Sequence, residues 1–114
     1  MNTVDSYHFG KMVINGRNYR SDLIVSADSV NCGWRRRRSH ELAVADIGEA
    51  LAAHPDVLVV GTGASGLLKV LPEVEQAAGS QGMEVIVAPT REACRTYNQR
   101  CGLQRVVAAF HLTC

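Results

Sequence analysis

The chain has 114 residues, a length that suits one domain with a single core. Hydrophobic residues make up 46% of the sequence and charged residues 20%, a composition that excludes intrinsic disorder. The 12 basic and 11 acidic residues leave a net charge of +1, so the overall charge indicates no polyanionic partner. We expect a single domain over residues 1–114, with a loose tail at residues 1–6.

The sequence predicts neither a membrane segment nor a secretory leader. Its longest apolar runs hold about half a dozen residues, whereas a membrane-spanning helix needs roughly 20. The start, Met1–Asp5, lacks the basic residues and the apolar stretch of a signal peptide. Cys94 and Cys101 would lie about 10 Å apart along a predicted helix, too far for a disulfide bond. We therefore expect no membrane insertion, reduced cysteines and a cytoplasmic location.

The N-terminal third predicts an antiparallel meander. The dipeptide Asn15-Gly16 separates two strand-like runs, residues 11–14 and 17–20. Both positions of such a tight turn need a positive φ, which Asn and Gly tolerate, so a hairpin is expected. A third strand is expected at residues 22–25.

The rest of the chain alternates between helices and strands. Helices are expected at residues 44–53, 72–78 and 91–100 or 91–101, and strands at residues 57–60, 84–88 and 105–110. Pro72 suits the first turn of the second helix, and Thr90 suits the N-cap of the third. The alternation implies right-handed parallel crossovers. The predicted class is mixed α/β: an antiparallel N-terminal meander joined to a βαβαβ half, in one mixed sheet with about three helices packed on it.

A glycine-rich turn at residues 61–66 matches the G-x-G-x-x-G pattern of dinucleotide-binding loops. Such a site requires a helix that begins inside the motif, but here the natural helix start is Pro72. The next strand ends at Ala88 without the acidic residue that would hold a ribose. We therefore expect no nucleotide and no cofactor. The turn either permits close packing or offers exposed N–H groups of residues 62–66 to an anion or a partner.

Polar residues at strand ends and helix starts could gather around one cleft for a small ligand. The members of this candidate cleft are Gly61, Thr62, Gly63, Ser65, Thr90, Tyr97 and Asn98. The same residues could instead only cap helices and pack, and this is the interpretation that we favour.

The only tryptophan, Trp34, is followed directly by the basic run Arg35, Arg36, Arg37 and Arg38. Together they form a candidate surface for a protein partner. The run could also contact phosphates while Trp34 stacks on a base. No second basic cluster supports nucleic acid as the partner, so we favour a solvated loop or a protein contact.

No pattern of side chains predicts catalysis or a metal centre. The four histidines are scattered without the spacing of a metal site. A thiol–imidazole pair of His40 with Cys32 or Cys94 has no diagnostic spacing either. We therefore expect no catalytic residue and no metal, and we lean towards a protein that is not an enzyme.

Several short motifs occur in a characteristic order: Asn15-Gly16 before Tyr19, Trp34, Val60-Gly61-Thr62-Gly63, Pro89-Thr90 before Ala93, Tyr97-Asn98, and Arg105-Val106-Val107-Ala108-Ala109. In this order the chain resembles a small α/β domain-of-unknown-function family first seen in a methanogen hypothetical protein. That family includes the mitochondrial complex I assembly factor three and the adipogenesis-associated domain protein. The resemblance extends from about Tyr7 to Leu112.

The resemblance implies a single-domain α/β fold with no established enzymatic activity and no cofactor. It also implies that Thr62, Gly63, Thr90, Tyr97 and Asn98 occupy recurrent positions of the family. The basic run at residues 35–38 departs from the family pattern, as does the number of cysteines.

We therefore expect a non-enzymatic interaction or assembly module, because the eukaryotic members of the family look like assembly or interaction proteins. Its partner would be an unknown protein, and the chain itself would be a monomer or a weak homodimer through an exposed sheet edge. The alternative is a small-ligand or anion-binding domain that uses the candidate cleft. A second alternative is weak nucleic-acid binding through residues 35–38.

Overall fold

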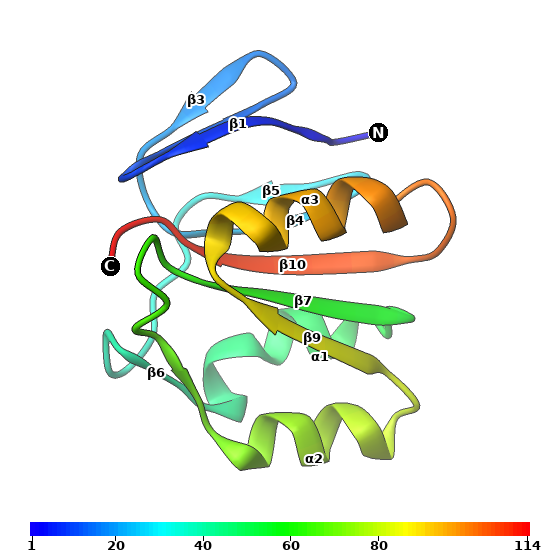
Figure 1. Cartoon of the computed structure of the whole chain (residues 1–114). Helices are drawn as coiled ribbons and strands as arrows, with labels where there is room; N and C mark the ends of the chain where they lie inside the picture. Colours follow the sequence, from blue (N-terminus) through cyan, green and yellow to red (C-terminus); the bar gives the residue numbers. More distant parts are fainter.

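A five-stranded mixed sheet lies at the centre of the computed structural model, which describes all residues 1–114 (Figure 1). Its strands lie in the order β5 (Val30–Asn31), β4 (Leu23–Ser26), β10 (Val106–His111), β7 (Val57–Thr62) and β9 (Glu84–Ala88). Strand β7 is parallel to both β10 and β9, whereas β4 is antiparallel to β10. Strands β7 and β10 are buried along their whole lengths, which explains their continuous apolar sequences.

The N-terminal hairpin forms a separate antiparallel sheet of β1 (Val4–His8), β2 (Lys11–Ile14) and β3 (Arg17–Tyr19). Asn15 and Gly16 have φ values of 49° and 78°, as the predicted tight turn requires. The third predicted strand, β4, leaves this meander and joins the central sheet. The reason is burial: Leu23, Ile24 and Val25 are all buried, so this strand needs cover on both faces.

The loose tail expected at residues 1–6 is not found from Val4 onward. Val4 and Tyr7 are buried in the core, and β1 pairs with β2. Asn2 also donates its backbone N–H to the Ala27 carbonyl at 2.9 Å. Burial of two apolar side chains therefore orders a segment whose sequence shows no strand pattern.

Helices cover both faces of the central sheet. The 3₁₀ turn η1 (Val44–Ile47), α1 (Gly48–Ala52) and α2 (Pro72–Ser80) lie on one face. Helix α3 (Thr90–Arg100) and the N-terminal sheet lie on the other (Figure 1). Alternate residues of β7 face the two sides, so the molecule has two core clusters, one around Tyr97 and Phe110 and one around Trp34 and Ile47. The predicted mixed α/β class is confirmed.

The local sequence predicted the starts of two helices, and one of the two predictions holds in full. Helix α2 begins at Pro72, with Glu73 and Glu75 in its first turn, as predicted. At α3, however, Pro89 is the N-cap residue, and no side chain caps the helix. The Thr90 hydroxyl, which we expected to be the cap, is engaged in tertiary hydrogen bonds instead. A small two-stranded parallel pair, β6 (Glu41–Leu42) and β8 (Lys69–Val70), connects the loops before α1 and α2.

Candidate functional site

Three residues of the candidate cleft join the carboxyl ends of the central strands. The buried Thr90 hydroxyl accepts a hydrogen bond from the Gly63 N–H at 2.8 Å and donates one to the His111 carbonyl at 2.6 Å. The Thr62 hydroxyl donates to the Ala88 carbonyl at 3.1 Å. These bonds connect β7, β9, β10 and the start of α3. Their geometry is that of a structural joint, which agrees with the packing interpretation.

The glycines of the turn are required by close approach. A Cβ atom at Gly61 would lie 2.8 Å from the Phe110 ring and 2.9 Å from the Thr90 hydroxyl. Gly63 has a φ of +104°, and a Cβ atom there would lie 2.6 Å from backbone atoms of Cys114. A larger residue at either position would force neighbouring atoms to shift, and at Gly63 it would also strain the backbone.

Most N–H groups that the turn could offer to an anion are used within the chain. Ala64 donates to the Thr113 carbonyl at 2.7 Å, and Leu67 donates to the Cys114 carbonyl at 3.1 Å. The Gly66 N–H donates to the Gly63 carbonyl at 3.2 Å. The turn thus holds the segment that follows β10, and exposed Ser65 lies on its outer side.

Tyr97 and Asn98 lie away from this joint. The Tyr97 hydroxyl donates to the Asn2 carbonyl at 2.8 Å. The Asn98 side chain accepts from the Val4 N–H and donates to the Val4 carbonyl, both at 2.8 Å. The amide group therefore bonds β1 as a neighbouring strand would, and α3 covers the edge of the N-terminal sheet. The structure brings Gly61, Thr62, Gly63 and Thr90 together, but not Tyr97 and Asn98.

The basic run does not form one surface with Trp34. Only 6% of Trp34 is exposed, and its indole N–H donates to the Asp46 carbonyl at 2.7 Å. The Arg36 guanidinium lies 4.8 Å from the centre of the Trp34 ring, and its side chain is 4% exposed. Arg35, Arg37 and Arg38 remain exposed, and Arg38 pairs with Glu41 at 3.7 Å. The predicted partner surface is therefore left without Trp34 and Arg36.

A largely buried polar network, which no pattern in the sequence indicated, surrounds Asp22. One carboxylate oxygen accepts from Arg36 at 2.9 Å and from His111 Nδ1 at 2.8 Å, and the other accepts from the Leu112 N–H at 2.8 Å. Burial raises the pKa of Asp22, but the hydrogen bonds from His111, Leu112 and Arg36 outweigh it and hold the pKa below its ordinary value. The members lie far apart in the sequence and share no spacing, so no pattern could reveal them.

Two more side chains adjoin this network on its outer side. The His40 ring meets the His111 ring edge-on, with 5.9 Å between centres, and the buried His111 Nε2 has no hydrogen-bond partner. His40 Nε2 lies 3.9 Å from the Cys114 sulfur, so His40 pairs with a different cysteine from the two that we considered. Cys94 is buried, which raises the pKa of its thiol to about 12. No group of three or more His, Cys, Asp or Glu side chains has metal-binding geometry.

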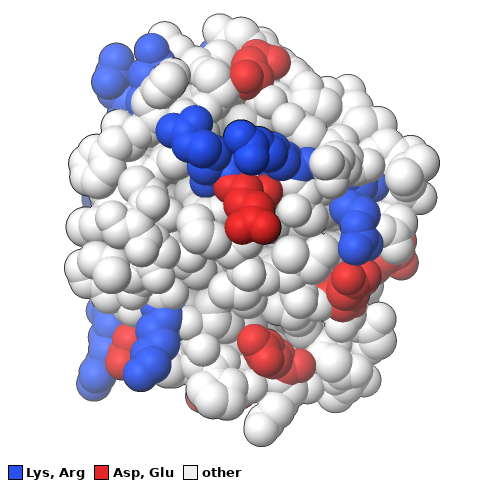
Figure 2. All heavy atoms as spheres, in the orientation of Figure 1, with Lys and Arg blue, Asp and Glu red and all other residues white.

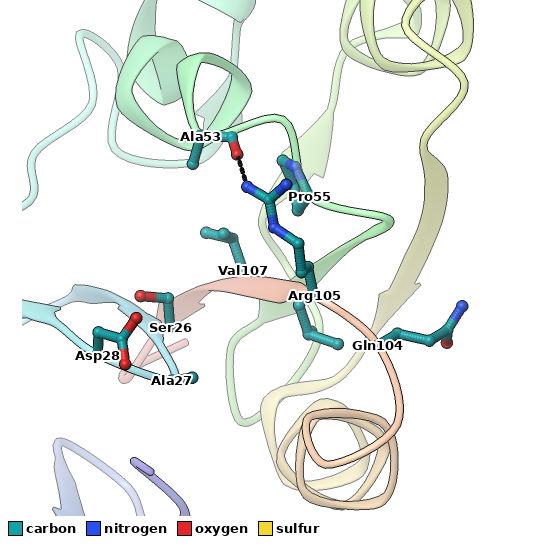
Figure 3. A pocket seen from close by; sticks show the side chains of 9 residues that line it. Ser26, Ala27, Asp28, Ala53, Pro55, Gln104, Arg105 and Val107 are labelled. Atoms are coloured by element: carbon teal, nitrogen blue, oxygen red, sulfur yellow. Dashed lines mark hydrogen bonds between the residues drawn. The ribbon is translucent and has the colours of Figure 1, made fainter.

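A cavity of about 250 Å³ lies at the opposite end of β10 (Figure 3). It is lined by Ser26, Ala27, Asp28, Ala53, Pro55, Gln104, Arg105, Val106 and Val107. The Arg105 guanidinium donates to the Ala53 carbonyl at its rim. A smaller hollow of about 170 Å³ lies between β1 and α3 and includes Asn98. Neither cavity contains a residue of the glycine-rich turn.

Residues 4–112 match the model of a family described as protein of unknown function (DUF498/DUF598), and the chain belongs to this family. The resemblance found in the sequence is thereby confirmed. The conserved hypothetical protein PH1505 from Pyrococcus horikoshii OT3 is 28% identical over 98% of this chain and 99% of its own, with a TM-score of 0.83. The protein MT938 is 28% identical over 100% of both chains, with a TM-score of 0.80.

The same fold occurs in a protein described as an outer membrane protein from Bartonella henselae. It is 21% identical over 98% of this chain and 95% of its own, with a TM-score of 0.83, and this likeness concerns the fold alone. In the present chain, none of the helices combines the length and the apolar character needed to cross a bilayer.

Proposed function

We propose that this chain is a protein-interaction module that binds an extended segment of a partner along the open edge of β9. The observation that carries the proposal is the difference between the edge of β9 and the other sheet edges in length, polarity and cover. Membership of a family of unknown function does not indicate an activity. The polar residues at the carboxyl ends of the strands are hydrogen-bonded within the chain. The edge of β9 is the longest apolar sheet edge, and no strand pairs with its outward backbone groups.

The other sheet edges are short, polar or covered. At the far side of the central sheet, β5 has only two residues, Val30–Asn31. In the N-terminal sheet, β3 carries Arg17 and Asn18, and β1 is covered by Asn98 of α3. Natural proteins protect their edges by such devices. Strand β9 has five residues, and only the first of them, Glu84, is charged. The apolar run Val85-Ile86-Val87-Ala88 that follows carries none of this protection.

The backbone of β9 presents free donors and acceptors. Glu84 donates its N–H to the Asp56 carbonyl at 3.0 Å, and Ala88 accepts from Thr62, so alternate residues from Glu84 to Ala88 face β7. The N–H and C=O groups of Val85 and Val87 must then point outward. Val87 is 42% exposed, and the surface over the middle of β9 is largely free of charged side chains (Figure 2). An added strand would satisfy these groups and cover the apolar side chains.

Photo-cross-linking tests the proposal. When benzoylphenylalanine replaces Val87, irradiation of cells of the organism to which the chain belongs should link the chain covalently to a partner protein. The matched control carries the same residue in place of Gln76, which is exposed on α2. Adducts at position 87 that are absent at position 76 and lost with Val85→Pro support the edge as the binding surface. Equal adducts at both positions, or none at position 87, would overturn the proposal.

Small-ligand binding is a second candidate function, favoured by the charges around the larger cavity. Figure 3 shows Asp28 and Arg105 on opposite sides, with Val107 between them, an arrangement that suits a small zwitterion. Free amino acids are the probes. Binding should shift the amide resonances of residues 104–107, and Arg105→Ala should abolish the shifts. Unchanged spectra with every amino acid at millimolar concentration would exclude this function.

A further inference from the structure

We propose that the strand that binds to β9 is β9 of a second copy of this chain, antiparallel and related by a two-fold axis at Ile86. The inference rests on the proposed role of this edge and assigns its partner. The central sheets of the two copies would then form one continuous sheet.

The apolar sequence along the edge of β9 is palindromic, so it can pair with an identical strand. Val85-Ile86-Val87 reads the same in both directions. A two-fold axis through Ile86 therefore places each Val85 opposite Val87 of the second copy and each Ile86 opposite its counterpart. Such an interface uses the same surface on both copies, as two-fold dimers do. β-Branched residues also pair favourably across antiparallel strands.

The hydrogen-bonding directions agree with this register. Val85 and Val87 are the residues whose backbone groups point outward, so each Val85–Val87 pair can exchange two hydrogen bonds across the axis. Ile86 and its counterpart would form the non-hydrogen-bonded pair between them. A shift of the register by two residues leaves only one such bonded pair, and a shift by one residue leaves none. The proposed register is therefore the one that satisfies most groups.

Side chains on both faces are compatible with the pairing. Val85 packs with the core beneath α2, whereas Ile86 and Ala88 pack with the core beneath α3. Across the axis, Glu84 would face the uncharged Ala88, so no like charges meet. Within its own chain Glu84 is already paired with Arg100 at 3.1 Å. The edge thus carries no charge that repels a second copy.

Disulfide trapping tests the register. In a background of Cys32→Ser and Cys114→Ser, the variant Ile86→Cys should form a disulfide-linked dimer on mild oxidation. In the proposed register the two Cα atoms of position 86 lie about 4.5 Å apart, within the range of disulfide geometry. Val85→Cys and Val87→Cys are the matched controls: neither should link to itself, but a mixture of the two should link. Linking by Val85→Cys alone would overturn the register.

Light scattering over a series of protein concentrations measures the association without any cross-link. The unmodified chain should change from monomer to dimer as its concentration rises, and Val87→Lys should weaken the dimer roughly tenfold or more. A monomer at millimolar concentration, together with no disulfide from Ile86→Cys, would overturn the second copy as partner. The mass of the benzoylphenylalanine adduct distinguishes the two proposals: twice the chain mass supports this inference, whereas any other mass supports only the interaction function.

Discussion

At Gly61, β7, β10 and the start of α3 approach one another closely. A side chain there would meet Phe110 and both the hydroxyl and Cα of Thr90. Gly79 of α2, by contrast, has open space where its Cβ would be. The two glycines therefore provide a comparison between a packing requirement and an unconstrained helical position.

We expect Gly61→Ala to lower the free energy of unfolding by about 1–3 kcal/mol, because the added methyl overfills a closed site. Gly79→Ala should leave it unchanged or raise it by up to about 1 kcal/mol, since Ala favours the helix. Urea denaturation of both variants and the unmodified chain measures the difference. Equal stabilities for Gly61→Ala and the unmodified chain would contradict the role of Gly61 in packing.

A second single residue on which the fold depends is Asp22, because its carboxylate accepts hydrogen bonds from Arg36, His111 and Leu112. Asp22→Asn should lower the free energy of unfolding at pH 7 by an amount on the order of 3 kcal/mol, because Arg36 loses its partner in a buried site. Exposed Asp28, which has no ion pair, is the matched control as Asp28→Asn.

The pH dependence of this variant follows from the direction of the Asp22 pKa. The pKa is lower in the folded state than in the unfolded state, so the contribution is fully present above about pH 4 and is lost as the pH falls through the folded pKa. The stability difference between the unmodified chain and Asp22→Asn should therefore shrink below pH 4. Urea denaturation at pH 7 and at pH 3 measures it. A difference that stays constant would contradict the assignment.

At the scale of elements, the features predicted well are those that a few neighbouring residues determine. The tight turn at Asn15-Gly16 and the helix start at Pro72 follow from backbone preferences, and both were found where expected. The sheet that β4 joins could not be predicted this way, because it depends on which distant strands can bury Leu23, Ile24 and Val25. Strand pairing is a long-range choice.

Only some residues of the candidate cleft lie close together, and the reason is geometric. Thr62, Gly63 and Thr90 meet because they follow parallel strands whose carboxyl ends share one edge. Tyr97 lies about 10 Å further along α3 than Thr90, so it reaches β1 rather than the turn. The network of Asp22, Arg36 and His111 gave no signal, since Arg36 stands in a run that resembles an ordinary exposed basic segment.

The joint at Thr90 can be tested at the same scale. Thr90→Val keeps the shape but leaves the Gly63 N–H and the His111 carbonyl without a partner, which should cost about 2–4 kcal/mol. Thr90→Ser restores the hydroxyl and should recover more than half of that loss. Denaturation gives the energies, and amide exchange at Gly63 should be faster in the valine variant only. Equal stabilities for the valine and serine variants would show that the hydroxyl contributes nothing.

At the scale of the whole molecule, the central sheet divides two core clusters that share its strands. The N-terminal sheet and α3 enclose one cluster, and α1, α2 and the Trp34 loop enclose the other. Because β7 and β10 contribute to both clusters, loss of one cluster removes the support of the other. We therefore expect the chain to unfold as a single cooperative unit.

Met12 and Trp34 allow this expectation to be measured. Met12 is fully buried in the cluster of the N-terminal sheet, whereas Trp34, the only tryptophan, reports on the opposite cluster. Met12→Ala should lower the free energy of unfolding by about 2–5 kcal/mol, because it leaves a cavity. Trp34 fluorescence and far-ultraviolet circular dichroism should shift together to the same lower urea midpoint. If Trp34 fluorescence kept its midpoint while the circular dichroism shifted, the two faces would be independent units, and the shared strands would not couple them.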